Sequence, residues 1–256
     1  MCKHYFEKLL IPGVWEITDK PDGINPYVDM YLIEGSCRAL LVDAGDSNDD
    51  LIGYLRKLTD KPIDLIITHG HGDHTAGMAQ FERVYMSNKD IDILNTCFGY
   101  NLDKSMVLDL QGGEVFDLGD YKIEVFKLPG HTYGSVVLLD RERQFLFTSD
   151  SLGSGTLWMQ LPHSTPLEVY VEELHKLEKL VEGMDKLRLF VGHDCQRLSI
   201  LGKQYITDVL ILSEGIVAGE IVGTPTEDHS DFFGGLSASY GQMSSLIYKP
   251  NNIFIG

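Results

Sequence analysis

Runs of hydrophobic residues separated by Gly, Pro, Asn and Asp occupy most of the chain and predict β-strands. The expected strands are Val14–Thr18, Tyr27–Glu34, Arg38–Asp43, Ile63–Thr68, Arg83–Met86, Val115–Leu118, Lys122–Leu128, Ser135–Asp140, Gln144–Thr148 and Leu187–Val191. Two later segments, Ser245–Tyr248 and Asn252–Ile255, are expected to close the sheets. The largely apolar composition of Ile63–Thr68 predicts a strand that is buried on both faces.

Hydrophobic residues at helical spacing predict three longer helices between these strands. The first follows a predicted N-cap at Ser47 and places Leu51, Ile52, Leu55 and Leu58 on one face. The second begins at a capping box, Thr165–Glu168, with proline in its first turn, and extends to Val181. The third covers Lys203–Ile221. A short helix is expected from Thr75, and residues 88–113 are expected to be less regular.

Strands flanked by helices in both halves indicate the α/β class. The predicted architecture is a four-layer αββα sandwich, in which two mixed β-sheets pack together with helices outside. No segment has the length or biased composition of a linker, so residues 1–256 are expected to form a single domain.

Composition narrows the range of partners. The 38 acidic and 21 basic residues give a net charge of −17, which disfavours nucleic acid and anionic membranes and favours a small-molecule substrate. No apolar run approaches the roughly 20 residues that span a bilayer. The 4 cysteines include no CxxC pair, which is typical of reduced thiols. We therefore expect a cytoplasmic protein.

Metal-binding side chains are concentrated directly after the strand Ile63–Thr68. His69, His71, Asp73 and His74 fall within six positions, and Gly70 and Gly72 between them allow a tight turn. Imidazole and carboxylate groups are the ligands that zinc and related metals prefer. All four cannot bind one ion comfortably, because His69 and His71 project the same way whereas the other two lie beyond a turn. The motif therefore predicts two metal ions.

Three further candidate ligands stand at the ends of predicted strands: His131, Asp150 and His193. With these motifs the chain resembles the metallo-β-lactamase superfamily. The resemblance implies that His69, His71 and His131 bind a first metal, that Asp73, His74 and His193 bind a second, and that Asp150 bridges them. It also implies that Asp43, in Asp43-Ala44-Gly45, orients the ligand loop from behind the metals.

The function that this resemblance implies is metal-dependent hydrolysis of a small ester, thioester or lactone. A hydroxide held between two divalent ions would attack the carbonyl, and Asp73 would help to move the proton. Zinc is the default metal, and iron and manganese are also compatible with the family. Asp150 stands where true zinc β-lactamases carry another residue, so penicillin hydrolysis is not expected.

Substrate specificity is less well determined by the sequence. Hydroxyacylglutathione hydrolases share the ligands but have a C-terminal helical extension that binds the thiol carrier. The lactonase-like members are similar in length, although Ser151-Leu152-Gly153 replaces the tyrosine of acyl-homoserine lactonases. Residues expected near the substrate are Trp158, Met159 and Tyr133, with pocket walls from Asp22–Tyr27, Phe98–Met106, Leu152–Leu161 and Phe232-Phe233.

Three other interpretations remain at this stage. A metal-dependent phosphodiesterase would use the same ligands. A diiron reductase would need a flavin module and typically a glutamate at the position of His71. A non-catalytic scaffold would usually have lost ligands. The oligomeric state is open, and Phe98–Met106 or Phe232-Phe233 could line either the pocket or a homodimer contact.

Overall fold

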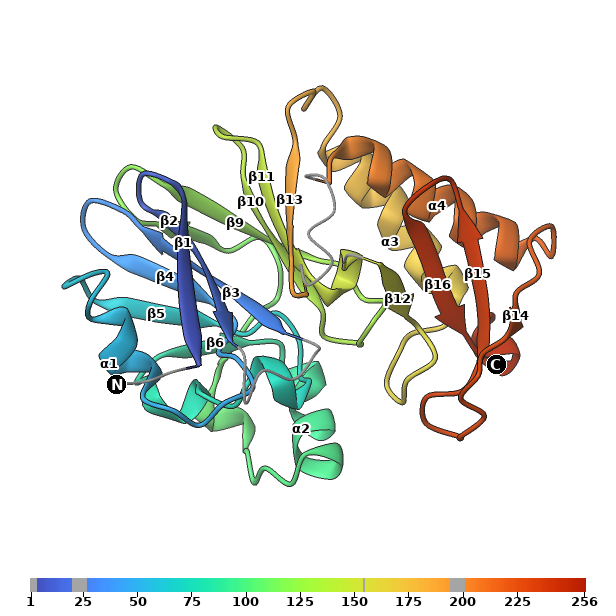
Figure 1. Cartoon of the computed structure of the whole chain (residues 1–256), viewed down its shortest axis with the longest axis horizontal. Coiled ribbons are helices and arrows are strands. Elements are labelled where there is room, and N and C mark those ends of the chain that lie inside the picture. The colour runs from blue at the N-terminus through green and yellow to red at the C-terminus, as the bar shows by residue number, and fades with distance from the viewer. Residues whose placement is uncertain (1–3, 20–26, 154, 194–200) are drawn as a thin grey trace.

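Two β-sheets pack face to face between two groups of helices (Figure 1). The computed structural model describes residues 4–19, 27–153, 155–193 and 201–256. Helices α1 (Leu51–Leu55) and α2 (Ile91–Cys97) lie against the first sheet, and α3 (Leu167–Leu180) and α4 (Lys203–Val217) cover the second. The predicted αββα sandwich of the α/β class is therefore confirmed.

The first sheet has seven strands in the order in which they follow along the chain. They are β1 (Tyr5–Ile11), β2 (Val14–Asp19), β3 (Val28–Glu34), β4 (Ala39–Val42), β5 (Ile63–Ile66), β6 (Val84–Met86) and β7 (Leu108–Asp109). Strands β1 to β4 are antiparallel neighbours, and β4 to β7 are parallel. Asp64 interrupts the apolar sequence of β5 and is buried, but it pairs with Arg38 and Arg83.

The second sheet has five strands in the order β13-β11-β10-β9-β8. They are β8 (Val115–Asp117), β9 (Lys122–Lys127), β10 (Val136–Asp140), β11 (Phe145–Ser149) and β13 (Arg188–Val191). Only β11 and β13 are parallel neighbours within it. A third sheet, which the sequence did not predict, packs on α4 and contains β12 (Thr156–Trp158), β14 (Thr224–Pro225), β15 (Leu236–Tyr240) and β16 (Ser244–Tyr248).

Side-chain alternation along the strands divides the core into layers. Tyr31 and Ile33 of β3 pack between the sheets with Phe147 and Phe190, whereas Leu32 points toward the α1 side. A separate cluster joins the outer face of the second sheet to α3 and α4. Alternate side chains along the strands therefore place apolar residues on both faces of each of the two main sheets.

Several local predictions were wrong. Asp50 rather than Ser47 caps α1, because the Asp50 carboxylate accepts a hydrogen bond from the Gly53 N–H. Pro166 occupies the N-cap position of α3 without any side-chain cap bond, so the predicted capping box does not form. The helix expected from Thr75 is limited to the short 3₁₀ segments Gly72–His74 and Met78–Gln80.

Other differences concern where elements begin and end. The predicted strand Asn252–Ile255 is replaced by the 3₁₀ turn Pro250–Asn252. Helix α4 ends at Val217, just before Gly219 adopts a left-handed conformation with φ +72°. The sequence prediction missed β1, α2 and β12. Among the described residues, no helix is long and apolar enough to cross a bilayer.

Candidate active site

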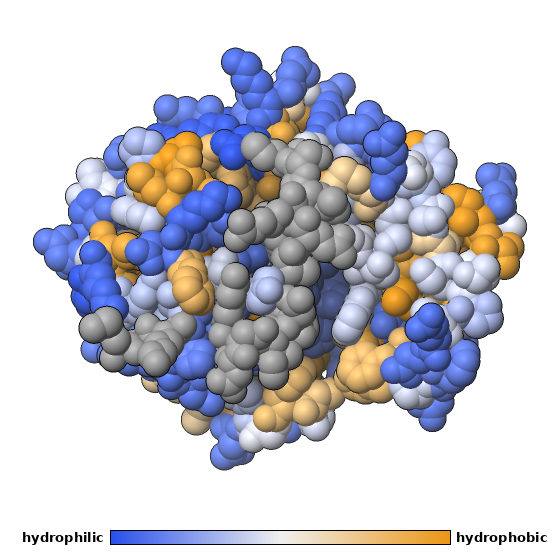
Figure 2. All heavy atoms as spheres, in the orientation of Figure 1, coloured by the Kyte–Doolittle hydropathy of each residue, from blue (hydrophilic) through white to orange (hydrophobic). Residues whose placement is uncertain are grey.

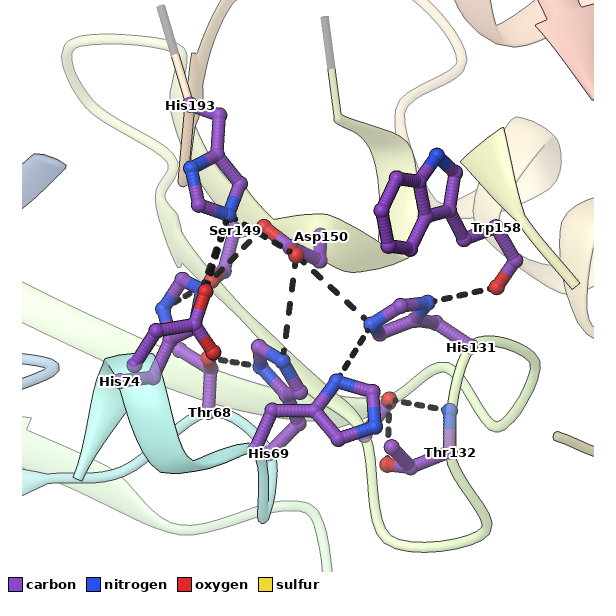
Figure 3. Close-up of polar contacts among 12 residues, drawn as sticks. Thr68, His69, His74, His131, Thr132, Ser149, Asp150, Trp158 and His193 are labelled. Carbon is purple, nitrogen blue, oxygen red and sulfur yellow. Dashed lines mark hydrogen bonds and ion pairs between the residues drawn. The ribbon is translucent and has the colours of Figure 1, made fainter. Parts of the chain in front are cut away.

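All seven predicted ligands come together in one cluster. Figure 3 shows His69, His74, His131, Asp150 and His193 of this cluster. The segment 67–74 follows β5 and turns through the 3₁₀ helix Gly72–His74. His131 lies in the connection between β9 and β10, Asp150 directly follows β11, and His193 comes shortly after β13. The second sheet thus supplies the three ligands that the local motif lacks.

The ligand atoms form two groups. Those of His69, His71 and His131 lie within 4.8 Å of one another, as do those of Asp73, His74 and His193. In the first group, His71 Nδ1 is 2.9 Å from His131 Nε2. In the second, His74 Nε2 is 3.3 Å from His193 Nε2. Imidazole nitrogens that face each other in this way are arranged to share a cation.

Asp150 lies between the two groups (Figure 3). Its Oδ2 is 3.3 Å from His193 Nε2 and 3.7 Å from His131 Nε2, and its Oδ1 is 3.5 Å from His74 Nε2. Two buried atoms of the cluster, Asp150 Oδ1 and His69 Nε2, make no hydrogen bond. Because buried polar atoms are normally satisfied, these two atoms and the surrounding donor set fit bound divalent metal ions.

Protonation in the first group suits metal binding. Burial lowers the pKa of His71 to about 3 and the pKa of His69 well below its ordinary value. Burial likewise lowers the pKa of His131. These imidazoles are therefore neutral at pH 7, and a neutral imidazole is the form that binds a metal.

The second group is governed by opposite charges. Burial alone would lower the pKa values of His74 and His193, but Asp150 and Asp73 outweigh burial and raise both. Burial acts to raise the pKa of Asp73, yet His74 and His193 bring that pKa down to about 2. The pKa of Asp150 is held well below its ordinary value by the same two histidines against the effect of burial. Both carboxylates therefore stay ionised.

Asp43 organises the loop from behind the ligands. Its Oδ1 accepts hydrogen bonds from the Thr68 N–H at 2.8 Å and from the Thr68 hydroxyl at 2.9 Å. Its Oδ2 lies 3.1 Å from His74 Nδ1 and accepts a bond from the Ser149 hydroxyl at 2.8 Å. A proton on His74 Nδ1 leaves Nε2 free to face the metal position.

Asp43 and Ser149 both carry backbone strain, with φ values of 63° and 45°. A positive φ is unfavourable for residues with a side chain and is kept only where the surroundings enforce it. Here the bond between the two side chains links the end of β11, beside Asp150, to the loop after β4.

Asp90 makes a second set of supporting contacts that the sequence analysis missed. It is fully buried, and its Oδ2 accepts hydrogen bonds from the Gly70 N–H at 2.8 Å and the Thr132 hydroxyl at 2.6 Å. Its Oδ1 accepts a bond from the Gly134 N–H at 2.7 Å. A side chain at Gly70 or Gly134 would collide with Asp90. Asp90 therefore ties the loop of His69 and His71 to the loop of His131.

Backbone carbonyls orient two of the other ligands. His131 Nδ1 is 2.7 Å from the Trp158 carbonyl oxygen, and His193 Nδ1 is hydrogen-bonded to the Tyr27 carbonyl oxygen. Each bond places the proton on Nδ1, so that Nε2 points into the cluster.

A cavity of about 470 Å³ opens onto the ligands. Its lining consists of His71, Asp73, Phe98, His131, Asp150, Gly153, Thr156, Leu157, Trp158, Leu161, His193, Phe232 and Phe233. Trp158 is thus on the wall, as are Phe98 and the Phe232-Phe233 pair. Met159 and Tyr133, which the sequence analysis placed near the substrate, are absent from this lining. Met159 is buried in the core beside α3 and α4, and Tyr133 is exposed but does not line the cavity. The predicted wall segment 22–26 lies outside the described residues.

Comparison with known proteins decides the family. A sequence profile of the metallo-β-lactamase superfamily matches residues 25–193, a range that includes all seven candidate ligands. The chain belongs to the metallo-β-lactamase superfamily. The human protein named acyl-coenzyme A thioesterase MBLAC2 is 27% identical over 244 residues, which cover 79% of this chain and 87% of that protein.

Two other superfamily members illustrate the range of the match. A hydroxyacylglutathione hydrolase from Roseobacter denitrificans is 25% identical over 167 residues, covering 62% of this chain and 61% of the relative. The structure of a metallo-β-lactamase from Pontibacter korlensis superposes with a TM-score of 0.65 at 17% identity, covering 82% of this chain and 99% of that structure. This structural likeness supports the fold, and the relatives support a hydrolase.

Proposed function

We propose that this superfamily member is a hydrolase that uses two metal ions to cleave a thioester, releasing a carboxylic acid and a thiol. The observation that carries the proposal is the position of Asp150 between two groups of candidate ligands, with Oδ1 buried and without a hydrogen-bond partner. Relatives named as acyl-coenzyme A thioesterases and hydroxyacylglutathione hydrolases favour a thiol leaving group.

Bound divalent ions would supply Lewis acidity and lower the pKa of a water molecule toward neutrality. We propose zinc as the resident metal because imidazole and carboxylate ligands suit it, and iron and manganese are the alternatives. His69, His71 and His131 would hold one ion, Asp73, His74 and His193 the other, and Asp150 both.

The chain's own residues would orient the reactants. Asp73 lines the cavity and is partly exposed, and its pKa of about 2 keeps it ionised at neutral pH. It can therefore accept a hydrogen bond from the attacking water and pass a proton toward the leaving thiolate, which departs as the thiol. The thioester carbon gains the water oxygen as its bond to sulfur breaks.

A phosphodiesterase is less well supported by the cavity. Its described lining contains neither Lys nor Arg, and the chain carries a net charge of −17. A phosphodiester would meet little positive charge apart from bound metal. A small-molecule substrate, a cytoplasmic location and the lack of a nucleic-acid partner remain predictions.

The test compares four substrates on one metal-loaded sample: an acyl thioester, a p-nitrophenyl ester, a lactone and bis-p-nitrophenyl phosphate. We expect the thioester to give the highest kcat/KM, and His131→Ala to abolish its hydrolysis. The matched control is His175→Ala, which removes an exposed histidine on α3 that pairs with Glu214. Preferred cleavage of the phosphodiester would overturn the proposal.

Metal dependence is tested on the same protein. Treatment with a chelator should abolish hydrolysis and addition of zinc should restore it, while elemental analysis of protein purified without added metal should give about two ions per chain. Full activity in protein shown to be free of metal would contradict the proposal.

A further inference from the structure

We propose that the aromatic side chains Phe98, Trp158, Phe232 and Phe233 form an acyl subsite, so that this enzyme selects thioesters of uncharged, apolar acyl groups. The inference rests on the proposed thioester hydrolysis and adds the chemical class of the acyl group. All four side chains line the cavity that contains the candidate metal ligands. Each keeps between 39% and 44% of its surface exposed, although large aromatic groups are usually more buried.

The aromatic groups come from distant parts of the chain and face one cavity. Phe98 follows α2, Trp158 ends β12, and Phe232 and Phe233 lie in the loop between β14 and β15. The Trp158 and Phe233 ring centroids are 5.8 Å apart, and those of Phe232 and Phe233 are 4.7 Å apart, both with edge-on geometry. Apolar side chains lie along the lower edge of the molecule, on both of its halves, in Figure 2. The three rings from the second half therefore support one another as a wall.

The aromatic side chains of the proposed subsite lie directly beside the candidate metal ligands. Phe98 packs so closely on the ligand loop that a side chain at Gly72 would collide with its ring, and its ring centroid is 6.0 Å from that of His71. On the other side, the Trp158 carbonyl oxygen accepts the hydrogen bond that orients His131. A thioester whose carbonyl lies at the ligands would therefore place its acyl chain directly against these aromatic rings.

Apart from the candidate metal centre, the described lining of the cavity offers no cationic partner for a charged acyl group. Over the residues that the structure describes, its lining contains neither Lys nor Arg, its acidic and histidine side chains are all candidate metal ligands, and Leu157 and Leu161 extend the apolar surface. Burying an acyl group that ends in a carboxylate costs free energy when no cationic partner is present, whereas each buried methylene of an alkyl acyl chain stabilises the complex. The wall therefore discriminates between acyl groups by polarity.

The experiment uses N-acetylcysteamine thioesters, because this carrier is neutral and identical in every substrate. A fully buried methylene contributes about fourfold to kcat/KM, so burial of about four of the six extra methylenes of octanoyl should make it at least about 100-fold better than acetyl. Glutaryl, which ends in a carboxylate, should be at least about 100-fold poorer than hexanoyl.

Two variants test whether the aromatic wall causes this preference. Phe232→Ala and Phe233→Ala should each lower the octanoyl-to-acetyl ratio by about tenfold, because each removes much of an aromatic contact surface. Using a ratio cancels any loss of folded or metal-loaded protein. The control Phe254→Ala removes an aromatic side chain that is 55% exposed but does not line the cavity, and it should leave the ratio unchanged.

A binding measurement separates this inference from the proposed function. The thioether S-octyl-N-acetylcysteamine cannot be hydrolysed, and its binding should change the fluorescence of Trp158, one of the 2 tryptophans in the chain. Phe233→Ala should weaken this binding about tenfold, in metal-free as well as metal-loaded protein.

The outcomes are distinct. Thioester hydrolysis with equal rates for acetyl, octanoyl and glutaryl groups would overturn the acyl subsite and leave the proposed function intact. Binding of the octyl thioether without hydrolysis of any thioester would overturn the proposed function and support the subsite. Failure of both assays would overturn both.

Discussion

Replacing Asp90 by asparagine tests whether this buried carboxylate holds the two ligand loops together. Both of its oxygens accept hydrogen bonds: Oδ1 from the Gly134 N–H, and Oδ2 from the Gly70 N–H and the Thr132 hydroxyl. An asparagine amide has one oxygen and one NH₂ group. In either orientation, the NH₂ group faces a backbone N–H that has lost its acceptor.

The expected magnitude follows from that mismatch. A buried donor left without a partner costs about 1–3 kcal/mol, so Asp90→Asn should lower the free energy of unfolding by about that amount. Because the disturbed N–H groups belong to loops that carry His69, His71 and His131, metal affinity should also fall, by about 10–100-fold. Urea unfolding of the metal-free protein measures the first effect, and zinc titration of the folded protein measures the second.

Asp19 provides a matched control. It is also buried, but only its Oδ2 accepts hydrogen bonds, from the N–H groups of Asp46 and Ser47 at 2.9 and 2.8 Å, whereas Oδ1 has no hydrogen-bond partner. An asparagine can keep both bonds through its oxygen, so Asp19→Asn should change the free energy of unfolding by less than about 1 kcal/mol at pH 7. Equal stability and metal affinity of Asp90→Asn and the unmodified protein would refute the reasoning.

Three further predictions concern other buried groups. Asp43→Ala should weaken zinc binding by about 10–100-fold in a titration, and unchanged affinity would show that its bonds to Thr68 and His74 do not organise the site. Ser149→Gly should be about 1 kcal/mol more stable than Ser149→Ala in urea unfolding, because only glycine relieves the φ of 45°, and the reverse order would contradict this strain. Burial raises the pKa of the Asp19 carboxyl, so the stability that protonated Asp19 contributes is fully present below about pH 4 and is lost as pH rises through that raised pKa. The free energy of unfolding of Asp19→Asn, relative to that of the unmodified protein, should therefore increase from about pH 4 to 7. A difference that does not change with pH would contradict this prediction.

The features that depend on local pattern could be predicted from the amino-acid sequence. Strands such as β3 and β10 follow from short apolar runs between turn residues, and the long helix α3 follows from hydrophobic residues at helical spacing. The ligand motif from His69 to His74 is equally local, because its residue types and spacing, directly after a predicted strand, can be recognised without knowledge of the rest of the chain. Elements with little burial gave no such signal: in β1, most residues are exposed.

Contacts between residues far apart in the chain could not be predicted in this way, because they depend on how the elements pack. Period two places Trp158 and Met159 on opposite sides of the chain, but the packing of α3 and α4 decides that Met159 enters the core and Trp158 faces the cavity. Asp90 looked like one more acidic residue in an irregular stretch, because the N–H groups that it binds belong to loops 20 and 44 residues away. The residue types that can bind a metal are evident in the local sequence. The hydrogen bonds that hold these residues and the aromatic wall of the cavity arise from contacts between segments far apart in the chain.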